Sequence, residues 1–243
     1  MESQGNESST GEEKLMTVVE HLDELRGRII RCLIVIGLAF LAALVLAKDA
    51  VRILEAPAGN ISFQALSLEE PLLVYFKVAF YIAIVLALPY VLFEASLFVA
   101  PGLRKEERKM LLPIVIGGPI LFVAGATFAY KFVLPPMLFF FGSFGQGISP
   151  IHQRLDFYVS LVSSILLYMG LCFQLPIVLF ALSFTGLVSS GQLIKVWRYA
   201  IFGAALVAAI ITPDPTAISM LIVMAALTGL YFLSVGLLKI FGR

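Results

Sequence analysis

The chain has 243 residues, of which 60% are hydrophobic and only 14% are charged, and its mean hydropathy is +0.99. Soluble domains are about half apolar and about a quarter charged, so the composition excludes a soluble globular protein and indicates a membrane protein. The formal net charge of +1 excludes a general attraction to nucleic acid, so charges matter here through their positions along the chain.

The N-terminal segment is polar and rich in Ser, Glu and Gly, without the basic and apolar regions of a cleaved signal peptide. We expect residues 1–12 to form a disordered cytoplasmic tail and residues 13–243 to form one membrane domain. The only cysteines, Cys32 and Cys172, lie inside apolar stretches, which favours buried thiols over a disulfide.

Six apolar stretches follow in chain order, separated by charges, prolines and glycines. Because lipid offers the backbone no hydrogen-bond partner, a stretch of about 20 apolar residues is expected to cross the membrane as a helix. The predicted helices are residues 29–47, 71–94, 110–131, 157–184, 197–211 and 215–238. The predicted fold class is therefore all-α: a polytopic membrane protein with six transmembrane helices.

Lys and Arg residues near the helix ends set the expected orientation, because cytoplasmic loops carry an excess of both. One side of the membrane collects Lys14, Arg26, Arg28, Arg31, Arg104, Lys105, Arg108, Lys109, Lys195, Arg198, Lys239 and Arg243. The other side holds Lys48, Arg52, Lys131 and Arg154. The first side is therefore predicted to be cytoplasmic, with both termini on it.

Two features depart from a bundle of straight, full-length helices. The fifth predicted helix has roughly 13 to 15 apolar residues, which at about 1.5 Å each reach only about 20 Å across a hydrocarbon core of about 30 Å. The bilayer is expected to thin there. Prolines within or near the other spans remove backbone donors, so curved or kinked helices that form a concave shape are expected, although membrane helices are rich in proline in any case.

Three polar side chains lie within or at the ends of the predicted spans. Lys77 is expected to snorkel outward or to pair with Glu69 or Glu70, and Glu94 is expected to be an exposed carboxylate at the cytoplasmic interface. Gln174 is the best candidate for a functional role, because its amide can hydrogen-bond a partner helix in lipid. A local hydrogen bond within the bundle is the alternative for Gln174.

Two groups of carboxylates lie on the side of the membrane where cations are expected. The first precedes the first span, where apolar residues recur at helical spacing and Glu24 lies one turn before Arg28, the spacing of an intrahelical ion pair. The second is residues 101–109, between the second and third spans. A binding role for these acids competes with a simpler reading, a solvated surface that compensates its own charge.

No catalytic or metal-binding arrangement is found in the sequence. The two histidines, His21 and His152, lie on opposite sides of the membrane in the expected topology, which excludes a shared metal site. We therefore expect neither an enzyme nor a cofactor. A secondary transporter of a small solute is the alternative function, although it would favour a charged pair near the membrane midplane and inverted repeats, and neither is found.

Two motifs resemble the TatC family, the signal-peptide receptors of the twin-arginine translocase. Residues 21–28 read His-Leu-Asp-Glu-Leu-Arg-Gly-Arg, which is similar to the family's HLxELRxR signature. Residues 98–103 read Phe-Val-Ala-Pro-Gly-Leu and are followed by Glu107 and Arg108, which is similar to the F-x-x-P-x-L and E-[RK] motifs. The resemblance covers residues from about 15 to 240.

The resemblance implies that the chain binds signals with two consecutive arginines on folded proteins, whose export uses the proton-motive force. Glu24 and Glu107 are the implied recognition carboxylates, because the planar fork of a guanidinium matches a carboxylate and an ammonium does not. Phe98 is expected to pack near the signal. Arg26 and Arg108 are expected to position the two acids or to compensate their charge.

The resemblance also implies partners and a location. Single-span subunits of the TatA/TatB type are expected to contact Gln174, which as an amide can hydrogen-bond but not titrate. Pro57 and Asp214 match motif positions on the periplasmic side and are expected to have structural roles. The implied location is a bacterial or archaeal cytoplasmic membrane, in contact with lipid, and self-association is left open.

Overall fold

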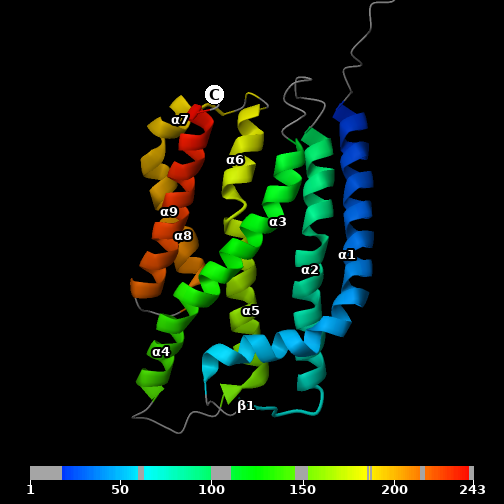
Figure 1. Cartoon of the computed structure of the whole chain (residues 1–243), viewed down its shortest axis with the longest axis vertical. Coiled ribbons are helices and arrows are strands. Elements are labelled where there is room, and N and C mark those ends of the chain that lie inside the picture. The colour runs from blue at the N-terminus through cyan, green and yellow to red at the C-terminus, as the bar shows by residue number, and fades with distance from the viewer. Residues whose placement is uncertain are drawn as a thin grey trace, which may run out of the picture.

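The computed structural model describes residues 18–59, 63–99, 111–145, 153–184, 186, 188–213 and 217–240. In these ranges the chain is built almost wholly from helices (Figure 1). One pair of short parallel strands, Phe63–Gln64 (β1) and Gln153–Arg154 (β2), joins two loops at one end of the molecule. The sequence analysis does not anticipate this pair, because two residues are too few to show the alternation of a strand.

Five helical segments of the described chain are long and apolar enough to cross a membrane. They are Leu22–Ala58, Glu70–Phe98, Leu112–Ser143, Leu155–Ser183 and Ala217–Ile240, and a shorter apolar helix spans Trp197–Ile211. Each of the six predicted helices overlaps one of these segments. The crossing of the membrane by the short helix, the cytoplasmic position of both termini and the concave shape stay predictions.

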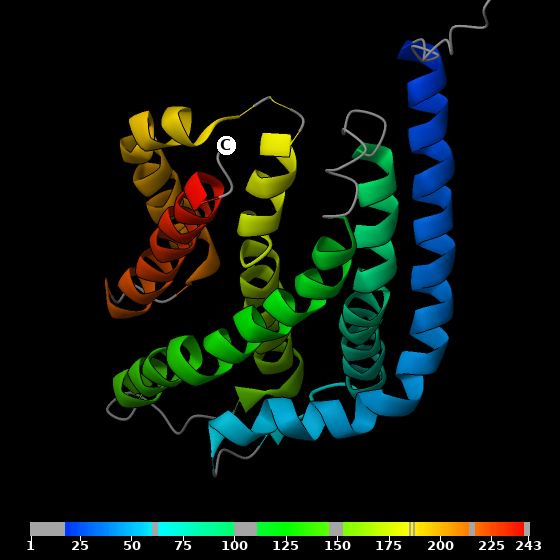
Figure 2. The ribbon, with the colours of Figure 1, turned by 45° about the horizontal axis from the view of Figure 1, so that its top comes forward.

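The first helix, α1 (Val18–Glu55), is much longer than the predicted span of residues 29–47. It starts upright beside α2 (Glu70–Val99), then bends, and its last part runs across one end of the bundle (Figures 1 and 2). Tyrosine hydroxyls from other helices donate hydrogen bonds to backbone carbonyls of this second half: Tyr75 to Leu44, Tyr130 to Ile53 and Tyr158 to Leu54. The bent helix is therefore anchored along the end of the bundle, and the short 3-10 helix η1 (Ala56–Ala58) continues from it.

The most extensive helix–helix contact is between α1 and α2. Ala43 and Ala47 of α1 and Ala79 and Ala83 of α2 are fully buried in one core. Small side chains let helix backbones approach closely in a membrane, where packing rather than hydrophobic burial drives association. Helices α1 and α2 therefore form a closely packed pair.

A nearly continuous helical rod follows, which runs diagonally across the molecule (Figure 2). It consists of α3 (Leu111–Phe128), the π-helical turn η4 (Ala129–Val133) and α4 (Leu134–Gly145). Pro135 and Pro136 cannot donate to the carbonyls one turn back, and their rings crowd those carbonyls, so the wide turn lies directly before them. The rod extends well past residue 131, where the sequence analysis ends the third helix.

The fourth predicted helix, residues 157–184, is two helices: α5 (Leu155–Cys172) and α6 (Leu175–Phe184). Pro176 has no N–H to offer the carbonyl of Cys172, and its ring would clash with that carbonyl. The backbone N–H of Gln174 instead donates to the carbonyl of Leu171 at 2.9 Å, in a tighter turn. The bend expected from proline is therefore present here as a break.

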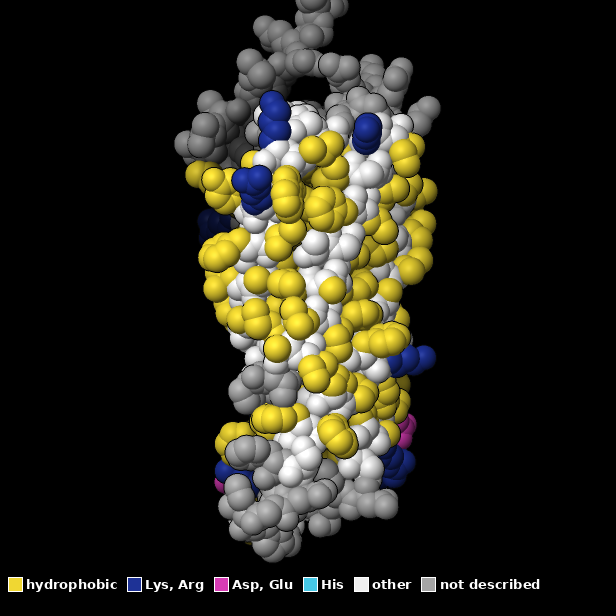
Figure 3. Space-filling view, turned by 90° about the vertical axis from the view of Figure 1, so that its left-hand side faces the viewer, with side chains coloured by type: hydrophobic (Ala, Val, Ile, Leu, Met, Phe, Trp, Pro, Cys, Tyr) yellow, Lys and Arg dark blue, Asp and Glu magenta, His cyan; other side chains and the backbone are white. Residues whose placement is uncertain are grey.

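The C-terminal part of the chain, from Ser190 onward, packs against α6 through its last helix. The short helix α7 (Ser190–Lys195) begins with a capping box between Ser189 and Gln192 and leads into α8 (Trp197–Ile211), whose bounds are those predicted. The last helix, α9 (Ala217–Ile240), contacts α6, α7 and α8. Apolar side chains cover the middle of this side of the molecule, and Lys and Arg side chains lie toward its two ends, the pattern of a surface that faces lipid (Figure 3).

Candidate functional site

The structure places part of the predicted site where α1 and α2 run side by side. Glu24 lies near the start of α1, and Phe98 lies at the end of α2 and shares a groove with Leu25, the neighbour of Glu24. Arg26 is exposed on α1. Glu107 and Arg108 lie outside the described residues, so the meeting of Glu24 with Glu107 stays a prediction.

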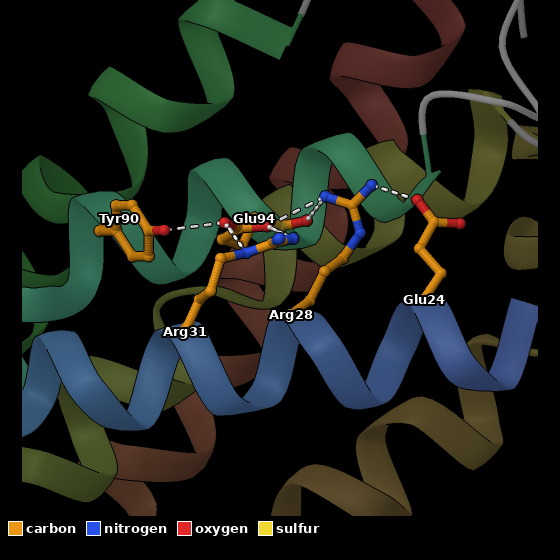
Figure 4. A network of polar contacts seen from close by, with 5 residues as sticks. All are labelled: Glu24, Arg28, Arg31, Tyr90 and Glu94. Carbon is orange, nitrogen blue, oxygen red and sulfur yellow. Dashed lines mark hydrogen bonds and ion pairs between the residues drawn. The ribbon is translucent and has the colours of Figure 1, made fainter.

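A network of charged groups beside Glu24 is centred on Glu94 of α2 (Figure 4). The Oε1 atom of Glu94 accepts hydrogen bonds from Arg31 Nε at 2.9 Å and from the Tyr90 hydroxyl at 2.8 Å. Its Oε2 atom accepts from one terminal nitrogen of Arg28 at 3.0 Å and from Arg31 at 3.2 Å. Both carboxylate oxygens of Glu94 therefore accept two hydrogen bonds each.

The exposed position expected for Glu94 is wrong, because only 5% of the residue is accessible. Arg28 and Arg31 are three residues apart on α1, so both side chains leave the helix on the face that meets α2. A buried carboxylate needs compensating charge, and these two guanidiniums provide it. The spacing of the two arginines, together with that of Tyr90 and Glu94, is the sequence signal that could have found this network.

Arg28 connects this network to Glu24. One terminal nitrogen of its guanidinium contacts Glu94, including the Glu94 carbonyl at 3.3 Å, and the other forms an ion pair with Glu24 (Figure 4). The intrahelical pair of Glu24 and Arg28 predicted from their spacing is therefore confirmed. The side chain of Arg28 is 13% exposed and that of Glu24 is 22% exposed, so Glu24 is the more accessible partner of the pair.

A groove of about 350 Å³ lies over this network, between α1 and α2. Its walls are mostly apolar, and its polar lining comes from the two charged residues Arg28 and Glu94. The groove is lined by Leu25, Arg28, Ile29, Cys32, Leu33, Val91, Glu94, Ala95 and Phe98. Apolar walls beside an accessible carboxylate suit a ligand that carries a cation next to apolar side chains.

Gln174 lies at the break between α5 and α6 and is buried. Its Nε2 atom donates a hydrogen bond to the carbonyl of Gly118 on α3 at 2.9 Å. Its Oε1 atom is also buried and accepts no hydrogen bond from the described residues. The amide thus makes the local bond that the sequence analysis left as the alternative, while its acceptor is unused within the described chain.

A second polar cluster lies toward the opposite end of α2. In this cluster Lys77 does not pair with Glu69 or Glu70, which were its expected partners. Lys77 donates to Asp156 at 2.7 Å and to Ser160 at 2.6 Å, both on α5. Glu70 is engaged elsewhere, because it accepts hydrogen bonds from the backbone N–H groups of Leu66 at 2.8 Å and Asp156 at 3.0 Å. These bonds hold the start of α2 against the start of α5.

Of the two predicted structural residues, the structure describes Pro57, which lies away from the Glu24 end. Pro57 is half-buried in η1, where its fixed φ suits the tight turn that ends the bent helix. Asp214 lies outside the described residues. Among the residues that the structure describes, no group of three or more His, Cys, Asp or Glu side chains is placed to hold a metal ion.

Comparison with known proteins decides the family. The family model described as "Sec-independent protein translocase protein (TatC)" matches residues 20–225. The chain belongs to the TatC family. The resemblance read from its two motifs is therefore confirmed, and the chain is a multi-pass membrane protein of the Tat system.

Related proteins of the TatC family include a cyanobacterial one and several chloroplastic ones. The TatC protein of Synechocystis sp. is 38% identical over 228 residues, which are 94% of this chain and 90% of that protein. The chloroplastic TATC of Pisum sativum is 37% identical over 234 residues, which are 96% of this chain and 66% of that protein. The predicted location, a bacterial or archaeal cytoplasmic membrane, is therefore not confirmed, because the relatives include chloroplast proteins.

Two solved structures share the fold. Both are described as the twin arginine translocase receptor TatC, and both are 32% identical to this chain. One covers 92% of this chain with a TM-score of 0.78, and the other, determined in the detergent DDM, covers 90% with a TM-score of 0.80. The all-helical polytopic fold of this chain is therefore that of TatC.

Proposed function

We propose that this chain is the receptor for twin-arginine signal peptides within a Tat translocase, which exports folded proteins by using the proton-motive force. The observation that carries the proposal is that Glu24 already binds a guanidinium, that of Arg28, at the accessible end of the α1–α2 pair. A carboxylate that holds one guanidinium in this position has the chemistry to hold another. The description of two solved relatives as receptors supports the same function.

The arrangement around Glu24 suits a signal peptide in two further ways. A guanidinium offers paired donors in one plane, which distinguishes it from the single ammonium of lysine. The apolar groove lined by Leu25 and Phe98 lies beside Glu24 and can take apolar side chains next to the arginines. In the proposal, Glu107 supplies a second carboxylate, and Arg26 and Arg108 balance the charge of the acids.

The first test is binding of a synthetic twin-arginine signal peptide to the purified chain, compared with the same peptide carrying two lysines. We expect Glu24→Gln and Glu107→Gln each to weaken binding of the arginine peptide by about tenfold or more, because each removes a charge-assisted hydrogen-bond acceptor. Glu69→Gln, which changes an exposed carboxylate in the turn before the far end of α2, is the control. Equal binding of both peptides, or unchanged binding in both glutamate variants, would contradict the proposal.

The proposal extends to single-span TatA/TatB-type subunits, which would contact Gln174 from within the membrane. The support is its buried Oε1 atom, which accepts no hydrogen bond from the described chain and could accept one from a partner helix. We expect Gln174→Leu to weaken crosslinking between this chain and such a subunit. Undiminished crosslinking would leave Gln174 with its bond to Gly118 as its only role.

In this proposal both termini lie in the cytoplasm, together with the Glu24 end of α1. The support is the distribution of Lys and Arg along the chain, which is the main determinant of orientation in multi-pass proteins. The site would then face the compartment in which proteins bearing signal peptides are made.

A further inference from the structure

Glu24 is occupied by a guanidinium that belongs to the chain itself. Arg28 lies one helical turn after Glu24, and its second terminal nitrogen is the donor in their ion pair. An arginine from a signal peptide that binds Glu24 through the same oxygen must displace Arg28. The groove next to this pair has room for a ligand, so the exchange can take place without separation of α1 from α2.

The displaced arginine has a second carboxylate to hold it. Arg28 donates to the side chain of Glu94 at 3.0 Å and to its carbonyl at 3.3 Å. Glu94 in turn is fixed by Arg31 and Tyr90, which donate to it at 2.9 Å and 2.8 Å. Arg28 can therefore release Glu24 and remain compensated, without an isolated buried charge.

From this geometry we propose, on the basis of the function proposed above, that Arg28 is an internal competitor for Glu24 that sets the affinity of the site for arginine-bearing peptides. Glu94 is the positioning residue that draws Arg28 away from Glu24 when a peptide binds. Arg28 contributes to the resting state and not to the contact with the signal.

Competition of this kind has a quantitative consequence. A ligand that binds only the open form of a site has its affinity reduced by the fraction of molecules that are open. That fraction is a property of the chain alone, so Arg28 weakens every ligand of Glu24 by the same factor. Removal of Arg28 should therefore raise the affinities of the arginine and lysine peptides equally and leave their ratio unchanged.

The charge of the network must be held constant in the decisive variant. Glu24, Glu94, Arg28 and Arg31 together carry two negative and two positive charges. Arg28→Gln alone makes this set more negative and would attract any cationic peptide. The double variant Arg28→Gln/Glu94→Gln keeps the net charge at zero and still removes the competitor. Arg31→Gln is the matched control for the single variant Arg28→Gln, because it makes the same change in net charge beside Glu94 but leaves Arg28 next to Glu24.

The experiment measures the dissociation constants of the arginine and lysine peptides for the purified chain and these variants, with melting temperatures to verify folding. We expect the double variant to bind both peptides about five- to tenfold more tightly than the unmodified chain, which corresponds to the loss of one charge-assisted hydrogen bond in a partly exposed setting. Arg31→Gln should raise affinity by about twofold or less, because salt screens a change in net charge. Glu94→Gln alone should lower affinity, because Arg28 then has only Glu24 as a carboxylate partner.

Three outcomes would overturn the inference: a folded double variant that binds no more tightly than the unmodified chain, a change in the ratio of the two affinities, or an equal rise in Arg31→Gln. If the double variant does not fold, the single variant Glu94→Gln is the test. An affinity of Glu94→Gln that is not lower than that of the unmodified chain would then overturn the inference. Failure of the proposed function is distinguishable from these results. It would show in the unmodified chain, as a lack of preference for arginine or as binding that does not depend on Glu24.

Discussion

The carboxylate of Glu94 is stable in its buried position because charge-assisted hydrogen bonds replace the water that it has lost. Arg31 approaches through two nitrogens, and its own side chain remains 53% exposed. Arg28 is much less exposed and divides its guanidinium between two acids. The two arginines therefore differ in role: Arg31 compensates the charge of Glu94, and Arg28 couples Glu94 to Glu24.

A first prediction concerns the contribution of Glu94 to stability. Glu94→Leu removes the acceptor of two guanidiniums and a tyrosine hydroxyl, and it leaves Arg28 in a buried place with Glu24 as its remaining carboxylate. We expect the melting temperature of the detergent-solubilised chain to fall by about 5 °C or more. Glu69→Leu, at an exposed position in the turn before the same helix, should leave it within about 1 °C. Equal effects of the two variants would contradict this account.

At the residue scale, the sequence predicts contacts within a helix better than contacts between helices. The pairing of Glu24 with Arg28 follows from their spacing, because the helix itself fixes their distance. The burial of Glu94 depends on how α2 is rotated against α1, and no pattern within one helix contains that information. The partners of Lys77 are missed for the same reason, since Asp156 lies 79 positions later in the chain, on another helix.

At the scale of elements, close crossings of helices depend on glycine. A Cβ atom added to Gly125 of α3 would lie 2.7 Å from the carbonyl oxygen of Met169 and 2.7 Å from the ring of Phe173. The first of these neighbours is backbone and cannot rotate away. Gly117, two turns earlier on the same helix, has open space at the same position. The crossing of α3 with the α5–α6 break is therefore possible only with a bare backbone at residue 125.

The second prediction compares these two glycines. Gly125→Ala should destabilise the folded chain by about 1–3 kcal/mol, because α3 must move away from α5 to accommodate the methyl group. Gly117→Ala should be neutral or slightly stabilising, because alanine is the better helix former and meets no neighbour. Thermal unfolding in one detergent checks both variants. Equal stability of the Gly125→Ala and Gly117→Ala variants would contradict this prediction, because it would mean that α3 can move away from α5 without loss of stability.

The element boundaries that differ from the predictions have physical causes. The predicted third helix ends at Lys131 because a charged residue interrupts the apolar stretch. A lysine can, however, place its ammonium at an interface while the helix continues. The helical rod does continue, to Gly145. The bend of α1 has no counterpart in its sequence, since no proline lies between Val18 and Glu55, and the tyrosine bonds to its carbonyls come from other helices. The bounds of α8 are predicted correctly because a tryptophan–arginine pair and a proline flank a wholly apolar run.

At the scale of the whole molecule, the apolar helices differ greatly in length, and the predicted topology places them in one membrane. The span Leu112–Ser143 has 32 residues, which rise about 48 Å, and α8 has 15 residues, which rise about 22 Å. A hydrocarbon core of about 30 Å is shorter than the first and longer than the second. The long span lies diagonally, as tilting requires (Figures 1 and 2), but a short helix can be matched only by a thinner bilayer or by its flanking residues.

The last prediction is that the chain prefers thin bilayers because of α8. Trp197, the only tryptophan, begins this helix with Arg198 stacked over its ring, an arrangement typical of an interface anchor. In long-chain phosphatidylcholine, the short helix should draw Trp197 into the hydrocarbon and shift its fluorescence to shorter wavelength, and the melting temperature should be lower than in short-chain lipid. Insertion of one apolar turn into α8 should move the optimum to thicker bilayers, whereas the same insertion into the 24-residue α9 should not. Fluorescence and melting that do not depend on lipid chain length would mean that flanking residues, and not a thinner bilayer, compensate for the length of α8.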